Sequence, residues 1–156
     1  MLGSKSEYFF QSAEALHIRK LSLITYLNIN YYSTSEINIY LKAFNYFCKN
    51  PKQFDGATIV KDLYHIPGLD INAMLHDYLY IIFKTSANWY VRFYSDWLYA
   101  KEMERTGKGF LSWINFSLLI LTYPFWTPYI YLIKGKRCTK EDRFLFFEIY
   151  ETLIKK

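Results

Sequence analysis

The sequence contains little cysteine, and its two cysteines lie far apart. Cys48 and Cys138 show neither the spacing of a metal site nor a disulfide framework, so we expect both to be reduced and structural. The sequence also lacks a nucleotide-binding loop, a serine nucleophile elbow and a zinc motif. The sequence therefore does not indicate a nucleotide-binding enzyme, a serine hydrolase or a zinc enzyme. We expect no small-molecule cofactor.

Long runs of positive charge are absent too. Lys and Arg number 19 against 14 Asp and Glu, which gives a formal net charge of +5. This mild excess suits an anionic lipid surface, and we expect no nucleic-acid partner. The first residues, MLGSKSEYFF, carry early charges and no apolar signal-peptide core, so we expect no export by the general secretory route.

Apolar residues are plentiful and follow helical spacing. The chain has 156 residues, of which 52% are hydrophobic, enough for a real core in one small domain. The predicted fold is mainly α. The spacing predicts N-terminal helices, an antiparallel helix hairpin and a hydrophobic C-terminal helical region, with helices over 5–31, 36–49, 70–84, 89–105 and about a dozen residues from 139.

Candidate helix caps, together with glycine and proline residues, predict where the helices begin and end. We expect three parts of one compact domain: 1–50, 51–107 and 108–156. Ser35 is a predicted N-cap for the second helix and Asp70 for the third. The intervening residues 51–69 hold two Gly and two Pro, which predicts a loop with a short strand at Ala57–Val60 as an option.

Residues 109–133 contain no formally charged side chain. We weigh three interpretations. The first is a buried or interfacial helix ending before Pro124, followed by an irregular aromatic segment. The second is a helix that spans a bilayer, and the third is a surface for a partner or a membrane.

The string MLHDYLYII places two titratable residues in an apolar run. On a helix, His76, Asp77 and Tyr80 share one face, whereas Met74 and Leu75 lie on another. Because adjacent residues point about 100° apart around a helix, we expect His76 and Asp77 not to bond each other. Each is expected to have a different partner.

Asp96 is the expected partner of His76. It interrupts an apolar stripe on the next helix, and both residues lie ten positions from a turn near Ser86. Antiparallel helices would place them at matching height, where a carboxylate fixes the imidazole tautomer. Tyr80 could donate its hydroxyl to the same carboxylate. The alternative is a buried network that only locks the hairpin.

Asp77 is left over as a candidate ligand for a hard cation. Calcium would suit its carboxylate together with backbone carbonyls from a glycine-containing loop, and FDGAT, with Gly56, is such a loop. A metal phosphohydrolase of the HD type fits this compact hairpin less well. Lys84 and Arg92 could meet phosphate at the mouth of a site, although solvated surface charge is the simpler expectation.

LDINAMLHDYLY, followed by SDWLYAKEM, resembles the active-site helix pair of calcium-dependent phospholipases A-two, including the short domains of parvovirus capsids. The matching positions are Asp70, His76, Asp77, Tyr80 and Asp96. The resemblance implies that His76 activates a water for attack on a lipid ester, that Asp77 binds calcium and that Asp96, bonded to tyrosine, orients His76. The glycine-rich calcium loop and disulfides of the secreted enzymes are not recognisable.

A second resemblance covers about residues 54–107. FDGATI, HDYLY and SDWLYAKEMERTG are similar to a family of small, uncharacterised phage-encoded proteins. Together the resemblances imply a phage-encoded, phospholipase-like protein located in the virion, or in the host cytoplasm or at its membrane surface. The alternative is a non-enzymatic virion protein that uses the hairpin as a scaffold and docks other virion proteins.

Overall fold

The computed structural model describes residues 12–54, 69–107, 109–132 and 137–155, and within these ranges the regular elements are all helical. The predicted mainly α fold is therefore confirmed. The option of a strand at Ala57–Val60 falls outside the described residues. Contacts divide the chain into two compact units, Met1–Asp77 and Tyr78–Lys156, whose boundary falls within one helix. The predicted three-part division stays a prediction.

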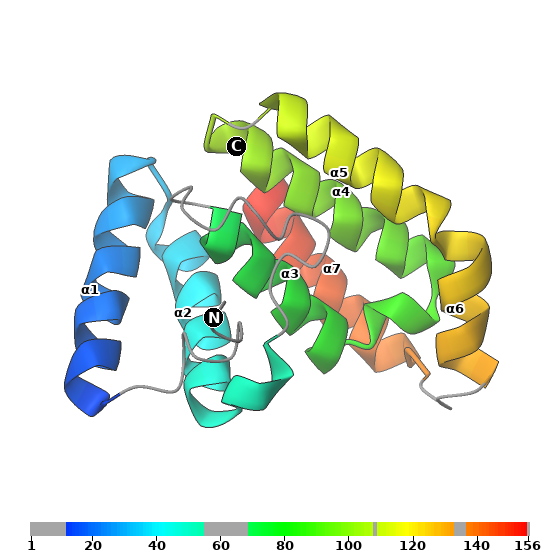
Figure 1. Ribbon diagram of the computed structural model, residues 1–156, viewed down its shortest axis with the longest axis horizontal. Coiled ribbons are helices and arrows are strands. Elements are labelled where there is room, and N and C mark those ends of the chain that lie inside the picture. Colours follow the sequence, from blue (N-terminus) through cyan, green and yellow to red (C-terminus); the bar gives the residue numbers. More distant parts are fainter. Residues whose placement is uncertain (1–11, 55–68, 108, 133–136, 156) are drawn as a thin grey trace, which may run out of the picture. The chain divides into compact units, whose positions relative to one another are not determined.

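Two helices form the described start of the first unit, and they lie side by side (Figure 1). Helix α1 spans Ala13–Ile29 and helix α2 spans Thr34–Lys49. The cap of α2 corrects the prediction of Ser35, because Ser33 accepts a hydrogen bond from the backbone N–H of Glu36 and the Glu36 carboxylate accepts one from that of Ser33. This reciprocal pair satisfies two N–H groups that a helix start leaves without partners.

The core of the first unit is apolar and aromatic. Helix α2 buries Tyr40, Phe44 and Phe47, which are spaced four and three residues apart and so lie on one face of the helix. Phe47 packs edge-on against Phe54, beyond the short helix η2 at Pro51–Gln53. The hydroxyl of Tyr40 donates a hydrogen bond of 3.2 Å to the side-chain carbonyl of Asn72.

Helix α3 spans Leu69–Ile82 and carries the HDYLY string across the unit boundary. Asp70 lies inside its first turn, which corrects the prediction of an N-cap at that residue. The helix ends two residues earlier than predicted. Lys84 has a φ of +49° there, a left-handed backbone that stops a right-handed helix.

Helix α4, Trp89–Arg105, is central to the second unit and ends where the sequence predicts. A short helix, η3 at Thr85–Ala87, precedes it, and Asn88 caps it by accepting hydrogen bonds from two backbone N–H groups. Helix α4 packs on α5, Gly109–Leu121, and on α7, Lys140–Ile154. Figure 1 shows α4 and α5 running alongside each other.

The uncharged stretch forms two helices rather than one. Helix α5 ends before Pro124 as expected, but the predicted irregular segment is wrong because Tyr123–Leu132 forms helix α6. Pro124 fits the first turn of α6, where a backbone N–H has no helical partner to lose. Among the described residues, no single helix is long and apolar enough to cross a bilayer; α5 and Tyr123–Tyr129 satisfy that criterion only as a pair, bent by 58°.

Candidate functional site

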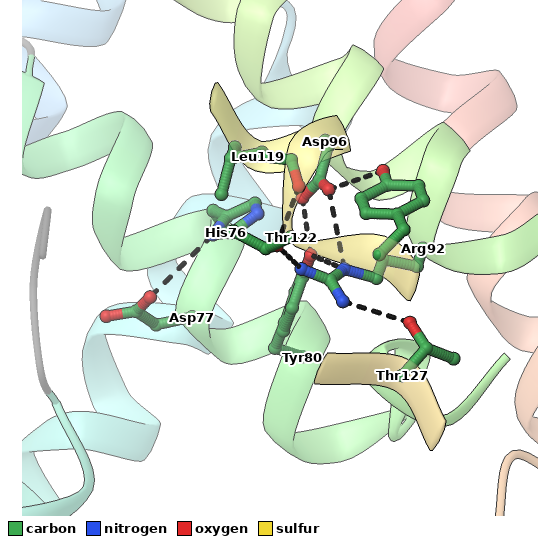
Figure 2. Close-up of polar contacts among 9 residues, drawn as sticks. His76, Asp77, Tyr80, Arg92, Asp96, Leu119, Thr122 and Thr127 are labelled. Atoms are coloured by element: carbon green, nitrogen blue, oxygen red, sulfur yellow. Dashed lines mark hydrogen bonds and ion pairs between the residues drawn. The ribbon is translucent and has the colours of Figure 1, made fainter. Parts of the chain in front are cut away.

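Helix α3 supplies three of the predicted site residues: His76, Asp77 and Tyr80. His76 Nδ1 lies 3.7 Å from Asp77 Oδ1, and both side chains are largely buried (Figure 2). The separation exceeds a hydrogen bond but lies within ion-pair range. The two side chains are therefore closer than expected, although they share no hydrogen bond. That each has a different main partner stays a prediction.

Asp96, the predicted orienting residue, lies on α4 and is fully buried. The hydroxyl of Tyr80 donates a hydrogen bond of 2.5 Å to its Oδ1. Tyr123, at the start of α6, donates one of 2.5 Å to Oδ2. The expected bond between Tyr80 and Asp96 is therefore present. Each carboxylate oxygen accepts a bond from a phenol.

Arg92 was expected at the solvated surface and is instead buried, with 2% of its surface exposed. Its Nε lies 3.8 Å from Asp96 Oδ2 and donates a hydrogen bond of 3.2 Å to the Tyr80 oxygen. The other guanidinium nitrogens donate to Thr127 and Thr122, at 2.9 and 2.6 Å (Figure 2). The side chain is held because its planar fork matches three acceptors at once.

Electrostatics fix which groups donate. Burial raises the pKa of Tyr80 well above its ordinary value, and the negative charge of Asp96 raises it further. Burial followed by the Asp96 charge likewise raises the pKa of Tyr123. Both phenols therefore keep their protons at neutral pH. Asp96 is the acceptor, and Arg92 supplies the opposite charge.

Arg92 also lies against an aromatic face. Its guanidinium carbon is 4.3 Å from the centre of the Tyr123 ring, within cation–π range. The hydroxyl of Thr122, which accepts from Arg92, donates in turn to the backbone carbonyl of Leu119. This network of Tyr80, Arg92, Asp96 and Tyr123, which we call the Asp96 network, joins α4 to the beginning of α6.

The metal prediction rests on Asp77 and on Gly56. Gly56 lies outside the described residues. In the described part of the chain, no group of three or more His, Cys, Asp or Glu side chains could hold a metal ion. Asp77 alone could contribute a carboxylate oxygen, and it does so beside an imidazole nitrogen. Calcium binding stays a prediction.

Sequence reasoning missed Arg92 as a site residue, along with Tyr123, Thr122 and Thr127. One signal was available, since Arg92 and Asp96 are four residues apart and lie on neighbouring turns of α4. The other three lie around the break between two helices that the sequence predicts as one helix and an irregular segment. Nothing local marks Tyr123 as a partner of Asp96, or Thr122 and Thr127 as partners of Arg92.

The arrangement holds the buried Asp96 carboxylate by two phenol hydrogen bonds and a nearby guanidinium. His76 precedes Tyr80 by four residues on α3, so the two belong to successive turns. The pairing of His76 with Asp96 stays a prediction. Comparisons of this chain with models of protein families, with curated proteins and with solved structures found no match.

Proposed function

We propose that this is a phage-encoded, phospholipase-like hydrolase that cleaves lipid esters. His76 is the general base, Asp96 orients it, and Tyr80 holds Asp96. Asp77 is a ligand for calcium, together with backbone carbonyls near Gly56. The resemblance of the HDYLY helix and the later Asp-bearing helix supports this assignment.

One observation carries the proposal. Asp96 is a fully buried carboxylate, and one of its two phenol donors is Tyr80, one turn beyond His76. Burying a charge is costly unless it is paired and hydrogen-bonded. A carboxylate fixed in this way is the group that orients a catalytic imidazole and stabilises its protonated form.

The chemistry follows from these roles. Neutral His76 takes a proton from water as the water oxygen bonds to the ester carbonyl carbon. The bond from that carbon to the alcohol oxygen then breaks, and His76 returns the proton to the departing alcohol. Calcium, when bound, would stabilise the negative charge that develops on the carbonyl oxygen.

The test compares His76→Gln with His17→Gln, which changes an exposed histidine on α1. Each protein is given calcium and phospholipid in mixed micelles, and released fatty acid is measured. We expect His76→Gln to lower the rate by about 100-fold or more, the usual loss of a general base. Equal rates for the two variants and the wild type would exclude the hydrolase.

A second candidate is supported by the completeness of the Asp96 network. Both oxygens of Asp96 accept phenol hydrogen bonds, and Arg92 is near enough for an ion pair. Such a network can simply lock helices in a virion structural protein that docks neighbouring virion proteins. In that case His76→Gln releases no less fatty acid than the wild type, and only stability distinguishes the variants.

A further inference from the structure

Helix α5 buries two polar side chains and exposes most of its large apolar ones. Its buried residues are Ser112, Asn115 and Phe116, which are 1%, 4% and 7% exposed. Its exposed positions, by contrast, are mostly large and apolar, and they repeat at helical spacing: Phe110, Trp113, Ile114, Leu118 and Leu121. A helix on a water-exposed surface normally turns its polar side outward, so α5 is arranged for apolar surroundings.

Specific contacts fix this orientation. The hydroxyl of Ser112 donates a hydrogen bond of 2.6 Å to the backbone carbonyl of Ala100 on α4. The side-chain amide of Asn115 contacts the sulfur of Met103 at 3.7 Å, also on α4. Turning α5 over would bury its apolar face but expose Ser112 and Asn115 and break both bonds. The apolar face is therefore outward because the polar face has partners inside.

Helix α6, which follows α5 in the chain, also exposes apolar side chains. Phe125, Trp126 and Leu132 are all exposed. The α5–α6 surface is defined here by these three side chains and the five of α5. Every residue of this surface belongs to the uncharged stretch 109–133, and the sequence places Lys108 before it and Lys134, Lys136 and Arg137 after it.

We propose that the α5–α6 surface docks onto an anionic lipid bilayer, with its apolar side chains entering the acyl region. Hydrocarbon accepts an uncharged apolar face, and negative headgroups attract the basic residues that flank the uncharged stretch in the sequence. Trp113 and Trp126 suit the boundary between headgroups and chains. A protein partner is the weaker match, because protein interfaces usually have a polar, charged rim and favour arginine.

This proposal does not rest on the hydrolase. Binding to a bilayer needs neither His76 nor calcium, so it can be measured with lipids that cannot be cleaved. Vesicles of equal parts ether-linked phosphatidylcholine and ether-linked phosphatidylglycerol, in EDTA, contain no acyl ester. Failure to bind would leave the hydrolysis of micellar substrate untouched, and loss of hydrolysis would leave binding untouched.

The experiment measures co-flotation of the full chain with these vesicles. The test variant is Phe110→Glu with Leu118→Glu, which are 80% and 40% exposed on α5. The matched control is Phe144→Glu with Leu145→Glu, which are 66% and 40% exposed on α7. We expect the test variant to lose about tenfold or more of the partition coefficient, since two apolar groups are replaced by repelled charges, and the control to stay within about twofold.

Tryptophan fluorescence gives a second readout. Ether-linked lipids brominated on their alkyl chains should quench the wild type, and the double change Trp113→Phe with Trp126→Phe should remove most of that quenching. Raising the salt concentration should weaken binding, because it screens the attraction between basic residues and headgroups.

Three results would overturn the proposal. One is wild-type protein that does not float with the anionic vesicles. Another is equal loss of binding in the α5 and α7 variants. The third is a wild type that does not bind vesicles and sediments as an oligomer, together with an α5 variant that is monomeric. The surface would then be an interface between copies of the chain.

Discussion

Helices α2 and α4 have nearly the same length, 16 and 17 residues, but they distribute polar residues in different ways. Helix α2 buries an apolar face, and its one buried charge, Glu36, serves the helix's own N-terminal cap. Helix α4 buries Arg92, Ser95, Asp96 and Glu102 along its length. It also exposes Trp89 and Phe93 at its start.

The difference shows where each helix obtains its partners. The charge in α2 is satisfied three residues away, so this part of the fold is local. Two charges of α4, Arg92 and Asp96, are satisfied in part by residues some thirty positions further on. A helix that departs from the usual pattern of burial needs tertiary partners, and such departures gather where a protein has a task to perform.

The first prediction tests this contrast with one chemical change, carboxylate to amide, made in each helix. Asp96→Asn should lower the free energy of unfolding by about 3–5 kcal/mol, because Arg92 would keep a buried charge without its counter-ion. Glu36→Gln should lower it by less than about 1 kcal/mol, since glutamine also completes a capping box. Urea denaturation at pH 7 measures both.

Similar losses of unfolding free energy for Asp96→Asn and Glu36→Gln would contradict this prediction, because the charge of Asp96 would then stabilise the fold no more than that of Glu36. Arg92→Met is the complementary change, because it leaves Asp96 without its cation. Combining Arg92→Met with Asp96→Asn should cost less than the sum of the two single changes, as expected for residues in one network.

The second prediction concerns the phenols that bond to Asp96. The raised pKa of Tyr80 keeps it protonated in the folded state at a pH where the unfolded chain has lost that proton. The folded state then binds more protons, so stability is complete below about pH 10 and falls above it, by up to about 1.4 kcal/mol per pH unit. Tyr80→Phe should therefore make the free energy of unfolding fall less steeply with pH above about pH 10.

At pH 7, Tyr80→Phe should also cost about 1.5–3 kcal/mol, because it removes a hydrogen bond to a charged group. Tyr31→Phe is the control, since Tyr31 is 91% exposed. Unfolding is measured between pH 8 and 11.5. If the free energy of unfolding falls as steeply with pH in Tyr80→Phe as in the wild type, the fold does not retain the Tyr80 proton.

The third and smallest prediction returns to local contacts. Ser33→Ala removes the cap of α2 and Asn88→Ala removes that of α4, where each side chain accepts backbone N–H bonds. Both changes should cost about 1 kcal/mol, because capping depends on the first turn alone. A much larger loss at Asn88 would mean that the start of α4 depends on more than its cap. Thermal unfolding of the two variants provides the measurement.

Much of the fold could be predicted from the sequence, for a local reason. The ends of α4 and the buried stripe of α2 follow from caps and helical spacing. The errors are also local in origin. Ser35 and Ser33 are both good caps, but Ser33 lies three residues before Glu36, which is the spacing of the capping box that forms. For α6, the prolines suggested a break, but one occupies the helix's first turn.

The candidate site was predicted in part. Tyr80 and Asp96 were expected to bond, and they do so at 2.5 Å. Arg92 was assigned to the surface because arginine is usually exposed, and nothing nearby in the sequence offers it Thr122, Thr127 and the ring of Tyr123. His76 and Asp77 proved closer to each other than the helical angle suggested, because rotamers as well as backbone direct side chains.

By itself, the sequence determined that this chain is helical, where most helices lie, and that HDYLY joins apolar packing to titratable groups. These properties depend on spacing and on neighbours within a few residues. Only the tertiary structure decided that Arg92 is buried, that Tyr123 shares Asp96 with Tyr80, and that α5 buries Ser112 and Asn115. Each of those outcomes depends on which distant groups satisfy a buried charge or hydrogen bond, and sequence spacing carries no record of that.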